Sequence, residues 1–210
     1  MSSSVAGADT RERILAAAVR RIASEGIDGV RIARIAMDAG VSSSLVHYHF
    51  DTREELLGQA LDYSYERAGT NRTEIDQIPD ATHAQRLAAV VEQCIPTTPE
   101  LQEDWLLWME LWLRAVRHPE LAPVAEGLYA RLHAWFADEL TAGVAAGEFQ
   151  PCDVDGLADR TIALLDGLGV RVLIGDRTVS FAGVRDAAVT QLAKELGVDR
   201  SALDGSANVP

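Results

Sequence analysis

The chain has 210 residues, 48% of them hydrophobic, and a formal net charge of −13. This length and apolar content indicate a folded globular protein, not a disordered chain. No run of about twenty apolar residues occurs, so the sequence predicts no membrane span. Residues 1–8 lack the basic and apolar parts of a secretory signal. Cys94 and Cys152 are too few for a structural zinc site and suit a reducing cytoplasm, where we expect the protein.

The acidic charge is unevenly distributed along the chain. Residues 1–50 contain six arginines and five acidic residues, a net charge of +1, so the rest of the chain carries −14. A surface that approaches phosphate needs only to be locally free of acid, so the total charge does not exclude a nucleic-acid partner. The same distribution fits an acidic protein with one nearly neutral end equally well.

Helical periodicity runs through the whole chain, and no convincing period-two pattern indicates a strand. We therefore predict an all-α fold of about nine helices. Gly26 and Gly40 are the expected breaks between the first helices, and Ser42 or Ser43 is the expected cap of the third. The first four helices are expected at about 10–24, 31–38, 43–50 and 52–69.

A polar segment at 70–81 separates these helices from a second set. The later helices are expected at about 82–95, 100–117, 120–146, 153–175 and 180–196. The predicted organisation is a disordered arm at 1–9, a three-helix head at 10–51, a connecting helix at 52–69, a larger helical body at 70–197 and a flexible tail at 198–210.

The third predicted helix has one apolar side and one polar side. Val46 and Phe50 are one turn apart and are expected to point into the core. The other side carries small hydroxyls, an apolar side chain and aromatic donors, at Ser43, Ser44, Leu45, His47 and Tyr48, with His49 at the rim. Such groups contact phosphates, base edges and thymine methyls. The pattern favours a helix-turn-helix that inserts this helix into the major groove, with Ser42 at the phosphate-attracting helix N-terminus.

Other interpretations of the head remain open at this point. A three-helix bundle whose exposed face happens to be rich in serine and histidine would show the same pattern. The head could also be a docking surface for another protein. A metal site at His47 and His49 is disfavoured, because residues i and i+2 do not share a face of a helix.

Residues 10–57 resemble the tetracycline-repressor (TetR) family of bacterial transcriptional regulators. The matching segments, in order, are Arg13-Ile14-Leu15-x-Ala17-Ala18, Glu25-Gly26, Ile35-Ala36-x-x-Ala39-Gly40-Val41-Ser42 and Tyr48-His49-Phe50-x-x-Arg53-Glu54-Glu55-Leu56-Leu57. The resemblance implies a repressor that binds a pseudo-palindromic double-stranded DNA operator as a dimer. It also implies that a small-molecule effector releases the DNA.

The sequence departs from the usual family pattern at three positions in the head. The family usually has Tyr where this chain has His47, Lys where it has Arg53, and Ser or Thr where it has Arg31. Arg53 retains a cation for phosphate binding, and Arg31 would add a further phosphate contact. Both arginines therefore join the candidate DNA-binding residues.

The resemblance implies that the last two long helices, 154–175 and 181–196, form a homodimer and that the other helices of the body hold the effector. The first of these helices is apolar on more sides than a lone surface helix would be, and Gly167 and Gly169 permit close helix approach. A symmetric contact of this kind is the commonest oligomer geometry. Packing of this helix inside a single chain is the alternative.

The predicted helix 100–117 is apolar on every side, which is typical of a helix in the middle of a protein. It carries an aromatic stripe at i, i+3, i+4 and i+7, formed by Trp105, Trp108, Met109 and Trp112. The stripe is either plain core or the wall of an effector cavity.

Two acidic residues, Glu110 and Asp166, lie within apolar helices, and buried acids are rare unless they are paired. They pair with an arginine (Arg114, Arg131 or Arg171), are simply exposed at a seam, or line, with the tryptophans, a cage for a cationic ligand. The body is loosely similar to the betaine- and choline-responsive branch of the family. That similarity rests on Trp112 and on the run Arg117-His118-Pro119-Glu120-Leu121.

Motifs typical of helical and other enzymes are missing from the sequence. It contains no Glu-x-x-His pair, Gly-x-Ser-x-Gly, phosphate-binding loop or His-Glu-x-x-His. We therefore expect no catalytic residue, cofactor or metal ion, and a regulator instead of an enzyme.

Overall fold

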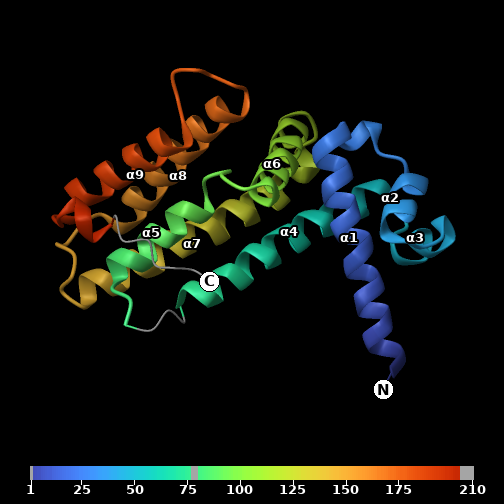
Figure 1. Ribbon diagram of the computed structural model, residues 1–210, viewed down its shortest axis with the longest axis horizontal. Coiled ribbons are helices and arrows are strands. Elements are labelled where there is room, and N and C mark those ends of the chain that lie inside the picture. Colours follow the sequence, from blue (N-terminus) through green and yellow to red (C-terminus); the bar gives the residue numbers. More distant parts are fainter. Residues whose placement is uncertain (1, 77–79, 204–210) are drawn as a thin grey trace. The chain divides into compact units, whose positions relative to one another are not determined.

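The computed structural model describes residues 2–76 and 80–203, and every regular element within these ranges is a helix (Figure 1). The predicted all-α fold is thereby confirmed. None of the described helices is long and apolar enough to cross a membrane. The side chains outside the description are those of residues 2–8, Arg53, Glu54, Leu57, 67–74, Asp76 and Glu120. The helices are α1 (Ser2–Gly29), α2 (Ile32–Ala39), α3 (Ser43–His49), α4 (Arg53–Asp76), α5 (His83–Gln93), α6 (Pro99–Arg117), α7 (Ala122–Ala145), α8 (Val154–Leu173) and α9 (Phe181–Leu196), with single 3-10 turns at Pro119–Leu121 and Arg200–Ala202.

The described chain divides into two compact units. Unit 1 comprises Met1–Ala68 and Gln102–Ala125, and unit 2 comprises Gly69–Leu101 and Glu126–Pro210. Most of α6 therefore belongs with the three-helix head, although the sequence placed it in a body at 70–197. Polar contacts from α6 to α1 and α4, described below, explain this assignment.

In unit 1, α1 begins at Ser2, well before the predicted start at Thr10. The predicted arm is therefore helical from Ser2 on. No proline interrupts the segment, and Asp9 lies at i, i+4 spacing from Arg13, with 3.9 Å between carboxylate and guanidinium. The spacing of Ile14, Ala18 and Ile22 places them on one side of the helix, and all three are buried.

A kink at Gly26 interrupts α1 before its last turn. Gly26 has φ 67° and ψ 158°, a backbone conformation that is essentially restricted to glycine. A Cβ atom at this position would also lie 3.1 Å from Oε1 of Glu110, on α6. The predicted break at Gly26 is confirmed, and the chain makes one further helical turn to Gly29.

The helix α4 is longer than the sequence predicted. Thr52 caps its N-terminus, since the hydroxyl of Thr52 accepts a hydrogen bond from the backbone N–H of Glu55 at 3.0 Å. The helix then continues to Asp76 instead of ending near Gly69. The polar residues after Gly69 do not break a helix, no proline occurs among them, and Ile75 is buried.

In unit 2, polar contacts fasten α5 to the helices around it. Thr82 caps α5 through a capping box with Gln85. The carboxylate of Glu148 accepts a hydrogen bond from the backbone N–H of His83 at 2.8 Å. The His83 ring lies 3.0 Å from Oε2 of the buried Glu139 on α7.

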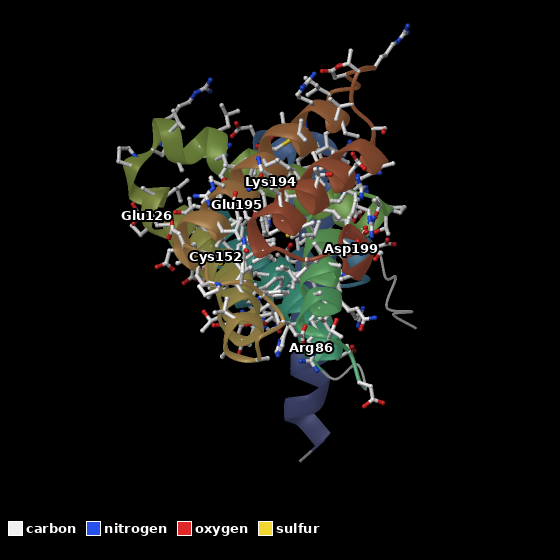
Figure 2. All side chains as sticks on the ribbon, turned by 90° about the vertical axis from the view of Figure 1, so that its left-hand side faces the viewer. Arg86, Glu126, Cys152, Lys194, Glu195 and Asp199 are labelled. Atoms are coloured by element: carbon white, nitrogen blue, oxygen red, sulfur yellow. The ribbon has the colours of Figure 1, made fainter. Side chains whose placement is uncertain are left out.

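The helices α8 and α9 lie side by side in unit 2 (Figure 1). Arg160 of α8 pairs with Glu195 of α9 at 2.5 Å. The amide of Gln150 donates to the backbone oxygen of Glu195 at 2.9 Å, which ties the segment before α8 to the end of α9. Glu195 and Cys152 are labelled in Figure 2. Burial and the neighbouring carboxylates of Glu195 and Asp153 raise the pKa of the Cys152 thiol.

Residues 198–203 are ordered, although the tail was predicted to be flexible from residue 198. Asp199 accepts hydrogen bonds from Ser201 and caps the 3-10 turn at Arg200–Ala202. Leu203 is completely buried, and its backbone oxygen accepts a hydrogen bond from Arg185. A single buried leucine after a polar stretch leaves little periodic signal in a sequence. Residues 204–210, the rest of the predicted tail, lie outside the description.

The kink at Gly26 leads to a prediction about stability. Gly26→Ala should lower the free energy of unfolding by about 1–3 kcal/mol, because a side chain is strained at this positive φ and approaches Glu110. Gly58→Ala is the matched control: Gly58 lies in α4 with open space around it, and alanine there should add up to about 1 kcal/mol. Denaturant unfolding measures both variants. Equal stabilities would show that residue 26 does not require glycine.

Candidate DNA-binding interface and effector residues

The turn between α2 and α3 is fixed by glycine and by an arginine of α1. Gly40 adopts the left-handed conformation, with φ 67° and ψ 37°, and its N–H bonds back to the carbonyls that end α2. Arg13 donates to the carbonyl oxygen of Ala39 at 2.5 Å and lies 3.5 Å from that of Gly40. The two helices of the motif are thereby held to α1 at the turn itself.

Ser42 begins α3 as its N-cap. Its hydroxyl accepts a hydrogen bond from the N–H of Leu45 at 3.2 Å and lies 2.8 Å from the hydroxyl of Ser44. The predicted cap is confirmed, and the side chain of Ser42 remains exposed to solvent.

The two sides of α3 are arranged as the sequence indicated. Val46 and Phe50 are buried, with 0% and 2% exposure. Tyr48 is 80% exposed. Ser44 and His47 are exposed, and Ser43, Leu45 and His49 are half-buried. The polar face therefore points away from the core of unit 1.

Several arginines of the head form ion pairs with acidic residues of the head. Arg21 of α1 pairs with Asp38 of α2 at 2.5 Å and with Glu25 at 2.6 Å, and Arg34 of α2 reaches Glu25 at 3.0 Å. The guanidinium of Arg21 holds the pKa of both carboxyls below their usual values. These contacts hold α2 against α1, so they also help to fix the position of α3, which follows α2.

Arg31 differs from these arginines. It occupies the N-cap position of α2 in an extended conformation, and its side chain is exposed. Within the described part of the chain, its guanidinium has no hydrogen bond or ion pair. A cation of this kind is available for a phosphate. Arg53 begins α4, and its side chain lies outside the description.

The sequence analysis missed two residues of this region. Arg13 was matched to the family pattern, but its bonds to the turn could not be recognised. Met37 of α2 is 67% exposed, an unusual position for a large apolar side chain. Its spacing from the buried Ile35 and Ala36 would have placed it on the outer side of α2.

In the part of α6 that belongs to unit 1, the tryptophans form one cluster. Trp112 makes edge-to-face contacts with Trp105 and Trp108, at ring centroid distances of 6.1 and 6.5 Å. Trp105 is buried, whereas Trp108, Met109 and Trp112 are half-buried. The indole N–H of Trp108 is buried and, among the described groups, has no hydrogen-bond partner.

Glu110 does not join the tryptophan cluster as a ligand cage would require. Its carboxylate lies against the kink of α1 and accepts a hydrogen bond from the backbone N–H of Ile27 at 3.4 Å. Arg114, a predicted partner of this acid, pairs with Asp28 at 2.6 Å. The structure thus gives Glu110 a contact to α1 in place of the predicted arginine, and its role in effector binding stays a prediction.

In unit 2, Asp166 of α8 accepts a hydrogen bond from the hydroxyl of Tyr129 of α7 at 2.8 Å. Arg171, one of its predicted partners, pairs with Asp176 instead. Burial raises the pKa of the Asp166 carboxyl, and no described cation pairs with it. Burial and the charge of Asp166 also raise the pKa of the Cys94 thiol to about 12.

Comparison with protein families assigns both parts of the chain. Residues 14–60 match the family described as bacterial regulatory proteins, tetR family. Residues 83–197, more than half of the chain, match the family described as BetI-type transcriptional repressor, C-terminal. The chain belongs to the TetR family of transcriptional regulators. The helix-turn-helix of this TetR-family protein is thus a DNA-binding element, and the family consists of regulators instead of enzymes.

Individual relatives agree with this assignment. The HTH-type transcriptional regulator BetI of Brucella melitensis is 25% identical over 190 residues, which cover 87% of this chain and 91% of that protein. A TetR-family regulator from Rhodococcus sp. is 30% identical, with a TM-score of 0.79 and coverage of 90% and 99%. A regulator from Saccharomonospora viridis, solved in complex with choline, is also 30% identical, with a TM-score of 0.74 and coverage of 89% and 96%.

The exposed guanidinium of Arg31 generates a prediction about phosphate binding. Arg31→Ala should weaken binding similarly on all DNA sequences and reduce the slope of log affinity against log salt by about 0.9, the value for one lost phosphate contact. Arg177→Ala, which removes an exposed arginine of unit 2, should leave the slope unchanged. Salt titrations of duplex binding measure this. An unchanged slope in Arg31→Ala would remove the residue from the interface.

Proposed function

We propose that this TetR-family regulator is a dimeric repressor that binds an inverted-repeat operator through α3. The outward face of α3 carries this proposal, because it presents hydroxyl, imidazole and phenol groups from a helix whose other side is buried. Ser42, Ser43, Ser44, Leu45, His47, Tyr48 and His49 are the proposed groove contacts. Arg31 and Arg53 are the proposed phosphate contacts.

Selection from random duplexes tests the operator. The wild-type protein should enrich an inverted repeat whose half-sites lie about 34–36 Å apart, or a multiple of that. Ser44→Ala and Leu45→Ala should change the preferred base at one position of each half-site. Ser24→Ala, which removes an exposed serine of α1, should leave the selected sequence unchanged. Enrichment without an inverted repeat would contradict the dimeric arrangement.

The proposed dimer forms through residues 154–175 and 181–196. One side of α8 presents small and apolar residues at i, i+1, i+4 and i+5, namely Ala163, Leu164, Gly167 and Leu168. Within one chain these residues are exposed or half-buried. A Cβ atom at Gly167 would meet nothing within 4 Å, so a helix of a second copy has room to approach closely. A partner that covers this side would remove apolar surface from water.

A pair of glycine variants tests this interface. Gly167→Glu should turn the dimer into a monomer at micromolar concentration, because a charged side chain would occupy the space of the partner helix. Gly127→Glu is the matched control: Gly127 is an exposed residue of α7 with open space around it, outside the proposed interface. It should stay dimeric. Light scattering measures the oligomeric state of both variants, and a Gly167→Glu variant that stays dimeric would refute this interface.

The proposed effector is a cation of the quaternary ammonium class, and its binding releases the operator. The relative from Saccharomonospora viridis was solved with choline, and this chain has a half-buried acid, Asp166, with no described cation beside it. Tryptophan faces attract such cations. Trp105, Trp108 and Trp112 are the aromatic candidates, Met109 is an apolar candidate, and Asp166 is the acidic candidate. A ligand oxygen could also accept the unpartnered N–H of Trp108.

Thermal shift with choline tests the effector. Choline should raise the melting temperature of the wild type, whereas its uncharged tert-butyl analogue should not. Asp166→Asn should abolish the shift, and Asp159→Asn, an exposed acid on the same helix, should retain it. The carboxyl of Asp166 must be ionised to attract a cation. Because its pKa is raised, choline affinity should fall with decreasing pH before an ordinary aspartate would be protonated. A shift that survives in Asp166→Asn would exclude this residue.

A further inference from the structure

At the kink of α1, the carboxylate of Glu110 accepts a hydrogen bond that a backbone carbonyl would accept in a regular helix. The conformation of Gly26 turns the N–H of Ile27 out of the regular hydrogen-bond pattern of α1. Glu110 accepts that N–H at 3.4 Å, and its Oε1 is the atom nearest to the missing Cβ of Gly26. A partly buried N–H without a partner costs free energy, so this carboxylate stabilises the kink.

Arg114 makes a second contact to the same segment. It lies four residues after Glu110 on α6, so the two side chains share a face of the helix. Its guanidinium reaches Asp28 at 2.6 Å. Asp28 is 91% exposed, so this pair alone stabilises little. Together, Glu110 and Arg114 contact three consecutive positions, Gly26 to Asp28.

The segment held in this way leads directly into the helix-turn-helix. Only Gly29, Val30 and Arg31 separate Asp28 from α2, and Val30 is buried. A different face of α6 contacts α4, where the hydroxyl of Ser64 donates to Asp104 at 2.7 Å. The helix α6 therefore touches both α1 and α4, and it also carries the tryptophan cluster.

We propose that Glu110 and Arg114 are positioning residues for operator recognition: from α6, they hold the segment between α1 and α2 in the orientation that presents α3 to DNA. Both residues act through the backbone of the head and touch no DNA themselves.

The physical form of the effect is a change in preorganisation. Without Glu110, the kink can adopt other conformations, and the operator must select the competent one at the expense of affinity. The lost affinity is confined to specific binding, because the phosphate contacts themselves are unchanged. The salt dependence should therefore stay the same, unlike that of Arg31→Ala.

Operator titration with two matched pairs of variants tests the positioning role. Glu110→Ala should weaken operator binding by about tenfold, within the usual range of coupling between sites, with the salt slope and the affinity for a random duplex unchanged. Glu103→Ala, which removes another half-buried acid of α6, should bind as the wild type does. Operator binding by Glu110→Ala within about twofold of the wild type would overturn the proposal.

A charge exchange provides the second pair. Arg114→Asp, which faces Asp28 with a like charge, should weaken operator binding by about threefold to fivefold. Asp28→Arg combined with Arg114→Asp should restore it, and Arg117→Asp on the exposed end of α6 should have no effect. Failure of the exchanged pair to restore binding would remove Arg114 from the proposal. If Glu110→Ala does not fold, Glu110→Gln and the charge exchange test the proposal in its place. Glutamine keeps the size of the side chain and an acceptor oxygen.

Discussion

The recognition helix α3 has seven residues, too few for a stable helix in water by itself. Its existence depends on the burial of Val46 and Phe50 against the rest of unit 1. The cap at Ser42 and the left-handed turn at Gly40 fix where it starts. Because the inner side is fixed by burial, the direction of the outer side, which carries the proposed DNA contacts, follows from it.

The features of the head that could be predicted are those that act over a few residues. A glycine at a turn, a serine before a helix and two apolar side chains one turn apart each leave a local pattern. For this reason Gly26, Gly40, Ser42 and the orientation of α3 were predicted correctly. The same reasoning applies to α5, α8 and α9, whose starts follow capping residues.

The features that could not be predicted depend on partners far away in the chain. Glu110 and Asp166 were recognised as acids in apolar helices, and the only protein partners considered for them were arginines. A carboxylate accepts equally well from a backbone N–H or from a phenol, and Ile27 and Tyr129 supply these donors. Leu203 is a similar case, since nothing close to it in the sequence shows that it is buried.

Unit 1 is discontinuous in sequence, and this bears on the order in which the protein is made. A ribosome completes α1, α2 and α3 long before it reaches α6, and domains generally fold as their residues emerge. Glu110 follows Ile27 by 83 residues, so during that interval the N–H at the kink lacks this acceptor. A nascent chain can thus form its helix-turn-helix early, but the orientation of that motif is set only after α6 has been synthesised. Premature termination before α6 would release a head without this support.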